Sequence, residues 1–284
     1  MVLLYIIAAL SVVVPAVLVP VLAAGPGRRV GRSRVAGQLR LAIDGLIATL
    51  GRVPAAAVVL LAWSAAVVAV FWPLGELLAS LENAIDWPVL RWVGPRRSPD
   101  FESFNWFYTA LGDRYPLKIV SIAAAAVFAV LWRRRWWIPV VAILGQFAVE
   151  QYVQAILALT VDRGHPPTGL GTYPSGGIAR IVLTFGTIAV FVALTFKLGK
   201  RSKVLLAAVV AVAATYEGYS RIYVEKHWLT DVVGGLLFGP ALLLGYVVFV
   251  LILADRFPAT APPGARERQD VGGAGRAGPG GAVP

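Results

Sequence analysis

The residues of this 284-residue chain best suited to chemistry lie just before its last apolar run. Ser220 and Arg221 come first, His227 follows, and Asp231 lies four residues after the histidine. If that turn is helical, His227 and Asp231 share a face. The carboxylate can then hold one imidazole nitrogen and leave the other free to attack or to accept a proton, while the planar Arg221 fork matches phosphate oxygens. Taken alone, this His–Asp spacing is more typical of an ion pair at a helix end.

A second polar cluster occupies residues 162–177, between two apolar runs. Its end reads Ser175-Gly176-Gly177, and backbone N–H groups at such a helix start can hold an anion, helped by the helix dipole. The segment also contains Arg163 and His165, and His165 is the only histidine besides His227. Taken alone, this segment is more typical of an ordinary Gly/Pro turn between helices.

The composition predicts which elements must position these residues. Hydrophobic residues make up 58% of the chain and charged residues 14%, whereas a soluble domain is about half apolar and about a quarter charged, so we expect membrane spans. The net charge of +11 does not indicate a nucleic-acid partner, because Arg and Lys lie between apolar runs, as topology signals do. With no Cys and two His, neither a thiolate site nor a metal centre is expected, and no cofactor is predicted.

Seven apolar runs are long enough, or nearly so, to cross a bilayer as helices of about 20 residues. We interpret the first run as a retained anchor, because it lacks a basic start and is long for a signal peptide; a cleaved signal peptide is the alternative. The runs lie roughly at residues 2–24, 53–79, 118–134, 136–160, 176–196, 203–219 and 229–253.

Charge predicts the orientation of these spans. Three connections, 25–52, 133–135 and 197–203, are basic and fall on one side of a seven-span arrangement, which the positive-inside rule makes cytoplasmic. The N-terminus and both polar clusters then lie outside, and the C-terminus lies in the cytoplasm. The abundance of Ala, Val, Arg and Gly is typical of a bacterium with GC-rich DNA, so we expect a multi-pass protein of the plasma membrane, the bacterial inner membrane.

The fold class expected is an all-α, polytopic membrane helix bundle with three parts. Residues 1–52 form the first transmembrane helix and a basic cytoplasmic loop, residues 53–256 form a six-helix membrane core, and residues 257–284 form a disordered cytoplasmic tail rich in Pro, Gly and Ala. The aromatic-rich loop 80–117 is equally compatible with a segment lying on the membrane surface and with ordinary packing over helix ends.

The two polar clusters together resemble the type 2 phosphatidic acid phosphatase (PAP2) superfamily. The third motif of that family is Ser-Arg, five residues, His, three residues, Asp, and Ser220, Arg221, His227 and Asp231 match it in full. The resemblance covers about residues 53–253. It implies a PAP2-like six-helix core, here with one extra N-terminal transmembrane helix.

The other two motifs depart from the family pattern. The second motif, Pro-Ser-Gly-His, ends in Gly177 here, so the histidine that protonates the leaving group in the family is missing. The first motif, Lys, six residues, Arg-Pro, keeps Pro166 but has Ala158 and His165 at the Lys and Arg positions. Our hypothesis is that Arg163 supplies part of the lost charge and that His165 replaces the missing acid.

The resemblance implies metal-free phosphoryl transfer, in which His227, oriented by Asp231, attacks phosphorus and forms a phosphohistidine. The implied substrate is a membrane lipid with a phosphate or diphosphate headgroup, of the polyprenyl diphosphate or phosphatidate type. The alternative is an inactive relative that binds, senses or moves anionic lipid or scaffolds a membrane partner, and the degenerate motifs favour it. The residues implied to hold the phosphate are Arg221, Ser220, Ser175, Gly176, Gly177 and Arg163.

Overall fold

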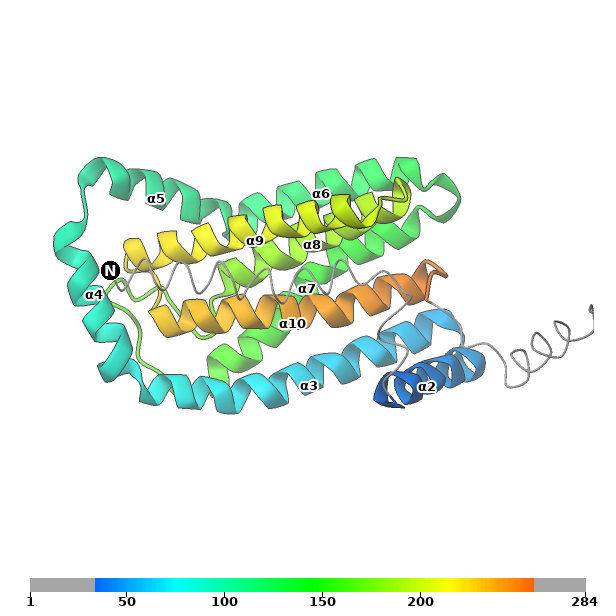
Figure 1. Ribbon diagram of the computed structural model, residues 1–284, viewed down its shortest axis with the longest axis horizontal. Coiled ribbons are helices and arrows are strands. Elements are labelled where there is room, and N and C mark those ends of the chain that lie inside the picture. The colour runs from blue at the N-terminus through cyan, green and yellow to red at the C-terminus, as the bar shows by residue number, and fades with distance from the viewer. Residues whose placement is uncertain (1–33, 258–284) are drawn as a thin grey trace, which may run out of the picture.

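The computed structural model describes residues 34–257, so the predicted first span and residues 258–284 of the predicted tail lie outside the described residues. The described part confirms an all-α membrane helix bundle (Figure 1). Its elements are α2 (Arg34–Leu50), α3 (Arg52–Ser80), η2 (Glu82–Asp86), α4 (Trp87–Val93), η3 (Gly94–Arg96), α5 (Pro99–Leu111), α6 (Arg114–Leu131), η4 (Arg133–Arg135), α7 (Trp137–Thr160), α8 (Gly176–Thr195), α9 (Lys200–Tyr223) and α10 (Leu229–Leu253).

The six apolar runs predicted between residues 53 and 253 are the long helices α3, α6, α7, α8, α9 and α10. Within the described residues, five of them, all but α9, are long and apolar enough to cross a membrane. Helix α9 has 24 residues, but its last turns carry polar and charged side chains, including Glu217 and Arg221, which lower its mean hydropathy. The chain is therefore a multi-pass membrane protein whose least apolar long helix ends in the predicted motif.

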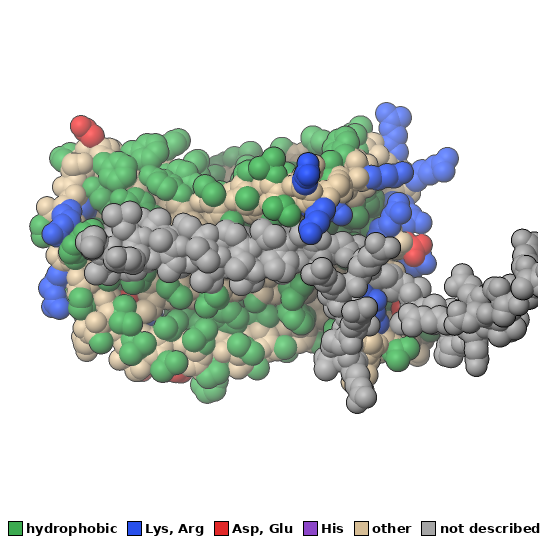
Figure 2. All heavy atoms as spheres, in the orientation of Figure 1, with side chains coloured by type: hydrophobic (Ala, Val, Ile, Leu, Met, Phe, Trp, Pro, Cys, Tyr) green, Lys and Arg blue, Asp and Glu red, His purple; other side chains and the backbone are tan. Residues whose placement is uncertain are grey.

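The long helices differ in how far they are enclosed. In α8 and α10, 72% and 67% of the most apolar stretch is buried, against 22% in α3 and in α6. The outer helices expose large apolar side chains such as Leu61, Val70 and Ile122, and Figure 2 shows hydrophobic side chains spread along the bundle surface. An outer surface of this kind suits a hydrocarbon solvent, so α8 and α10 form the interior that carries the polar clusters.

The two ends of the bundle differ in character. Helices α7 and α9 end, and α8 and α10 begin, at the same end, so segments 162–177 and 220–231 meet there (Figure 1). The opposite end carries α2, the η4 arginines and the basic α8–α9 connection, and Lys and Arg gather there in Figure 2. The two polar clusters therefore lie at the end remote from the basic connections.

Two segments predicted as connections have helical structure. Residues 34–50, within the predicted basic loop, form α2 and pack against α3. The aromatic loop forms η2, α4, η3 and α5, and α5 packs along the end of α9 through Phe101 on Tyr223, with ring centroids 5.0 Å apart. Phe104 and Phe107 stay 50% and 65% exposed, so α5 both covers α9 and presents aromatic rings outward.

Candidate active site

A tight turn joins α9 to α10 and carries three predicted site residues, Arg221, His227 and Asp231. The backbone N–H groups of Lys226 and His227 both donate to the carbonyl oxygen of Arg221, at 2.9 and 3.2 Å. Helix α10 begins two residues after His227, with Asp231 in its first turn. The motif predicted from spacing alone is thus one compact turn between two helices.

His227 and Asp231 are in direct contact. Imidazole Nδ1 lies 3.3 Å from Asp231 Oδ2, and the same oxygen accepts the backbone N–H of Trp228 at 3.2 Å, which caps α10. The helix-end role and the orienting role considered for this pair therefore coexist. Among residues 34–257, His227 Nε2 has no hydrogen-bond partner, so it is the nitrogen left for a substrate.

Burial decides the charge of this histidine. His227 is 4% exposed, and burial lowers its pKa to about 4, although the hydrogen bond that Asp231 accepts from the imidazole opposes the shift. The imidazole is therefore neutral at neutral pH, which is the form that can act as a nucleophile.

Arg163 approaches Asp231 from the other side. Its Nη1 lies 3.0 Å from Asp231 Oδ1, as an ion pair without hydrogen-bond geometry, and its Nη2 contacts Asp86 directly. Asp86 also accepts the Thr230 N–H at 2.9 Å and the Thr230 hydroxyl at 2.7 Å. We call His227, Asp231, Arg163 and Asp86 the nucleophile half of the site. In this half the Arg163 charge is already shared by two carboxylates.

Arg221 lies in a second group of charges. It is 2% exposed, and its Nε donates to Glu217 Oε1 at 2.6 Å while its Nη2 donates to Asp113 Oδ1 at 3.0 Å. Lys226 Nζ reaches both oxygens of Asp113, at 3.1 and 3.0 Å. We call Arg221, Lys226, Asp113 and Glu217 the cation half. Each of its cations is paired with a carboxylate of the chain itself.

The guanidinium of Arg221 also explains the glycine at position 177. A Cβ atom on Gly177 would lie 2.0 Å from Arg221 Nη2 and 2.3 Å from Cζ, so no side chain fits there with Arg221 in place. The family resemblance expects a histidine at this position. In this chain the space holds Arg221, and the family's acid has no room.

The remaining predicted phosphate ligands are placed differently. The Ser175 N–H donates to the Asp231 carbonyl oxygen at 3.0 Å, and its buried hydroxyl has no hydrogen-bond partner within the described residues. The Ser220 hydroxyl donates to the Glu217 carbonyl oxygen inside α9, at 2.8 Å. Gly176 begins α8 beside Arg180 and Glu150. The Ser175 hydroxyl is therefore unpaired in the described part of the chain, whereas the Ser220 hydroxyl is already bonded to the α9 backbone.

His165 lies in the loop that folds over His227. Its Nδ1 is 2.6 Å from the Gly171 carbonyl oxygen, and a Cβ on Gly171 would lie 3.1 Å from His227 Nδ1. The structure thus brings the predicted acid near the nucleophile but ties one of its nitrogens to the backbone.

Sequence reasoning missed Asp86, Lys226 and Arg180. Arg180, one turn into α8, donates through Nε to the Gly112 carbonyl oxygen at 3.2 Å and lies 3.4 Å from Glu150 Oε1 in α7. The contact with Glu150 joins α8 to α7. A charged residue inside an apolar run was the signal that could have identified Arg180.

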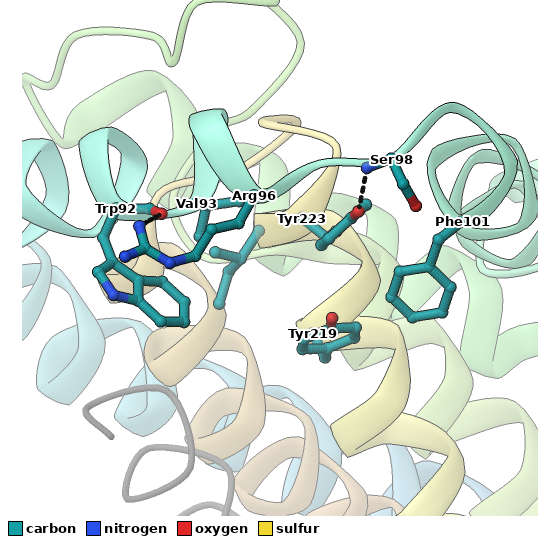
Figure 3. A pocket seen from close by; sticks show the side chains of 8 residues that line it. Trp92, Val93, Arg96, Ser98, Phe101, Tyr219 and Tyr223 are labelled. Atoms are coloured by element: carbon teal, nitrogen blue, oxygen red, sulfur yellow. Dashed lines mark hydrogen bonds between the residues drawn. The ribbon is translucent and has the colours of Figure 1, made fainter.

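A cavity of about 240 Å³ lies beside the site, on the other face of the last turns of α9 (Figure 3). Tyr219 and Tyr223 of α9 face Trp92 and Phe101 across it, and the Tyr223 hydroxyl accepts the N–H of Ser98 at 3.0 Å. The Arg96 guanidinium lies over the Trp92 ring, 4.6 Å from its centroid, at the rim. The cavity therefore joins an aromatic interior to a cationic edge.

The comparisons with known proteins agree with this architecture. Residues 158–255, which contain both polar clusters, match the PAP2 superfamily. The fold is similar to the crystal structure of a transmembrane PAP2-type phosphatidylglycerolphosphate phosphatase from Bacillus subtilis, with a TM-score of 0.55 and 19% identity over 68% of this chain and 98% of that one. No curated protein matches the chain.

Proposed function

We propose, from the membership of residues 158–255 in the PAP2 superfamily, that the chain is a membrane lipid phosphatase or phosphotransferase. The observation that carries the proposal is the buried, neutral His227, with Nδ1 directed at Asp231 and Nε2 without a hydrogen-bond partner in the described part of the chain. An imidazole in this state is ready to attack phosphorus. The substrate is a lipid phosphate or diphosphate, of the phosphatidate or polyprenyl diphosphate type.

The reaction takes two steps. Nε2 of His227 forms a bond to the terminal phosphorus while the bond from that phosphorus to the ester oxygen of a monoester, or to the bridging oxygen of a diphosphate, breaks. The departing oxygen takes a proton from the proposed donor, His165. Water then adds to phosphorus, the P–N bond breaks, and free phosphate leaves. Arg221, the Ser175 hydroxyl and the N–H groups at the start of α8 stabilise the charge on the phosphoryl oxygens.

His165 is the proposed proton donor, and the structure limits how it can act. If neutral His165 donates from Nδ1 to the Gly171 carbonyl oxygen, its Nε2 carries no proton. His165 can then protonate a leaving group only as the imidazolium. The group that leaves a lipid diphosphate is the lipid monophosphate, which needs less acid assistance than an alkoxide, so a lipid diphosphate is the substrate that best suits this site.

The proposed position of the site in the membrane rests on the charge of the connections and on the cavity beside α9. The described basic connections lie at the end opposite to the turn between α9 and α10, and by the positive-inside rule this supports a site at the outer face of the plasma membrane. The aromatic cavity beside α9 would take part of the apolar chain of the lipid, with Arg96 near the headgroup.

The test is phosphate release by the purified full-length chain in detergent. Phosphatidate, a polyprenyl phosphate and a polyprenyl diphosphate are compared, with His227→Ala beside the parent chain and His165→Gln as the acid variant. Release from at least one lipid should vanish in His227→Ala, and His165→Gln should slow release by about 10²–10⁴-fold for a poor leaving group. Release that persists in folded His227→Ala would overturn the mechanism.

A second function, binding of anionic lipid without turnover, is favoured by one observation. Arg163, Arg221 and Lys226 are each paired with carboxylates of the chain, and Gly177 leaves no room for the family's acid. A folded chain that retains lipid phosphates but releases no phosphate from any of them would support this function instead.

A further inference from the structure

The two cations of the cation half converge on one exposed carboxylate. Arg221 Nη2 and Lys226 Nζ each lie 3.0 Å from an Asp113 oxygen, and Lys226 contacts the second oxygen at 3.1 Å. A carboxylate held at both oxygens by two cations is bound as a phosphate would be bound. Lys226 directly precedes His227, and the charges of Arg221 and Lys226 both act on the His227 imidazole, so this seat lies close to the proposed nucleophile.

The side chains of the two carboxylates in the cation half differ in how firmly packing holds them. Glu217 is fully buried beside Gly112, where a Cβ would lie 2.2 Å from its Oε1, so its place is fixed by packing. The Asp113 side chain is 42% exposed. Asp113 is the N-cap of α6, yet its carboxylate makes no capping bond. Among residues 34–257, only the two cations bond the Asp113 carboxylate, and a rotation about its own bonds would release it.

The charge of a lipid headgroup determines whether it can replace the Asp113 carboxylate. Burial alone would raise the pKa of Asp113, but Arg221 and Lys226 outweigh it and lower the pKa, so Asp113 is an anion at neutral pH. Asp113 and Glu217 give the two cations one carboxylate each as an internal partner. A phosphodiester headgroup has one negative charge and would gain nothing over Asp113. A phosphate monoester or diphosphate has about two or more and would gain one further attraction.

We propose that Asp113 is a displaceable internal counter-ion that occupies the phosphate seat between Arg221 and Lys226, and selects lipid phosphate monoesters and diphosphates over phosphodiesters. Lys226 is thereby a phosphate-binding residue of the site. The inference rests on the proposed function for the identity of the site, and it adds the residue that sets the headgroup specificity. A membrane surface rich in phosphodiester headgroups makes such exclusion necessary.

The experiment measures binding without turnover. The full-length chain carrying His227→Ala is titrated calorimetrically, in detergent, with short-chain phosphatidate as the monoester and short-chain phosphatidylglycerol as the diester. In this chain the monoester should bind at least about tenfold more tightly than the diester. Asp113→Asn should tighten diester binding by about tenfold and reduce that ratio, because one ordinary charge repulsion is removed.

Three further variants make the result specific. Asp113→Glu keeps the charge and should keep the discrimination, and Asp100→Asn removes an exposed carboxylate at the start of α5 and should change nothing. Lys226→Gln should weaken monoester binding by about tenfold. Discrimination in Asp113→Asn equal to that in Asp100→Asn would overturn the inference while leaving the proposed function intact. No monoester binding in any folded variant would overturn both.

Discussion

The nucleophile half and the cation half of the site are built from the same turn, but they differ in how their charges are connected. In the nucleophile half, Asp231 stands between His227 and Arg163, so each group orients the next. In the cation half, Asp113 joins Arg221 and Lys226 at an exposed point, which a ligand can take over. The first half is arranged to hold a nucleophile, and the second is arranged to exchange an anion. Intact motif residues therefore do not by themselves make a phosphate site. Whether a cation can bind a phosphate depends on the carboxylates that are paired with it.

The largest effect that would test this comparison is expected at Asp231. Asp231→Asn keeps the side-chain shape but loses the anion that fixes the His227 tautomer, so kcat for lipid phosphate release should fall by about 10²–10⁴-fold. Asp86→Asn acts on Asp231 indirectly, through Arg163 and Thr230, and should lower kcat by about tenfold. Steady-state phosphate release measures both. Equal losses in the two variants would show that the nucleophile half is one structural unit rather than an ordered chain of contacts.

A control is needed because Asp231 also caps α10. Loss of a cap costs about 1 kcal/mol of stability, which alone would leave a folded chain. Circular dichroism and gel filtration of Asp231→Asn in detergent therefore separate lost orientation from lost fold.

An intermediate effect is expected at Gly177, which tests the cation half. The Cβ of Gly177→Ala would meet the buried Arg221 guanidinium and displace it from the phosphate seat. The KM for a lipid phosphate monoester should rise at least about tenfold, because a charge-assisted contact is lost, while kcat changes less, since His227 and Asp231 are untouched. Steady-state kinetics across substrate concentration separates the two parameters.

Gly199→Ala is the matched control, because a Cβ there meets no atom within 4 Å. An unchanged KM in Gly177→Ala would mean that Arg221 does not hold the phosphate.

The sequence predicted the long helices and the contact between His227 and Asp231 well, and for the same reason. Apolar runs and the His227–Asp231 spacing are local patterns, in which the deciding contacts lie within one helix turn. Asp86 reaches Arg163 across 77 positions, and Asp113 reaches Lys226 across 113, so no spacing rule connects them. Asp86 and Asp113 lie in the aromatic-rich segment 80–117, whose sequence has no hydrophobic period that would place them. The pairing of cations with carboxylates in both halves therefore became visible only from the structure.

The smallest expected effect concerns pH, and it distinguishes the nucleophile half from an ordinary exposed histidine. Burial lowers the pKa of His227 to about 4, so the folded chain keeps the imidazole neutral from pH 7 down to pH 5. In a His165→Gln chain, the rate of inactivation by diethyl pyrocarbonate, which acylates neutral imidazole, should change less than about twofold over that interval. A histidine with its usual pKa near 6.5 would lose about 25-fold.

The lowered pKa of His227 keeps its reactivity nearly independent of pH, but it makes the stability of the fold depend on pH. Between about pH 6.5 and about pH 4 the unfolded chain binds a proton at residue 227 that the folded chain does not, so stability should fall as the pH decreases through this interval. In His227→Gln this part of the pH dependence should disappear, which thermal unfolding at pH 7 and pH 5 would measure.

A rate of inactivation by diethyl pyrocarbonate that instead falls steeply below pH 6.5 would mean that Asp231 and water outweigh burial around His227. The nucleophile half would then be an open, protonated ion pair, and its contrast with the cation half would be lost.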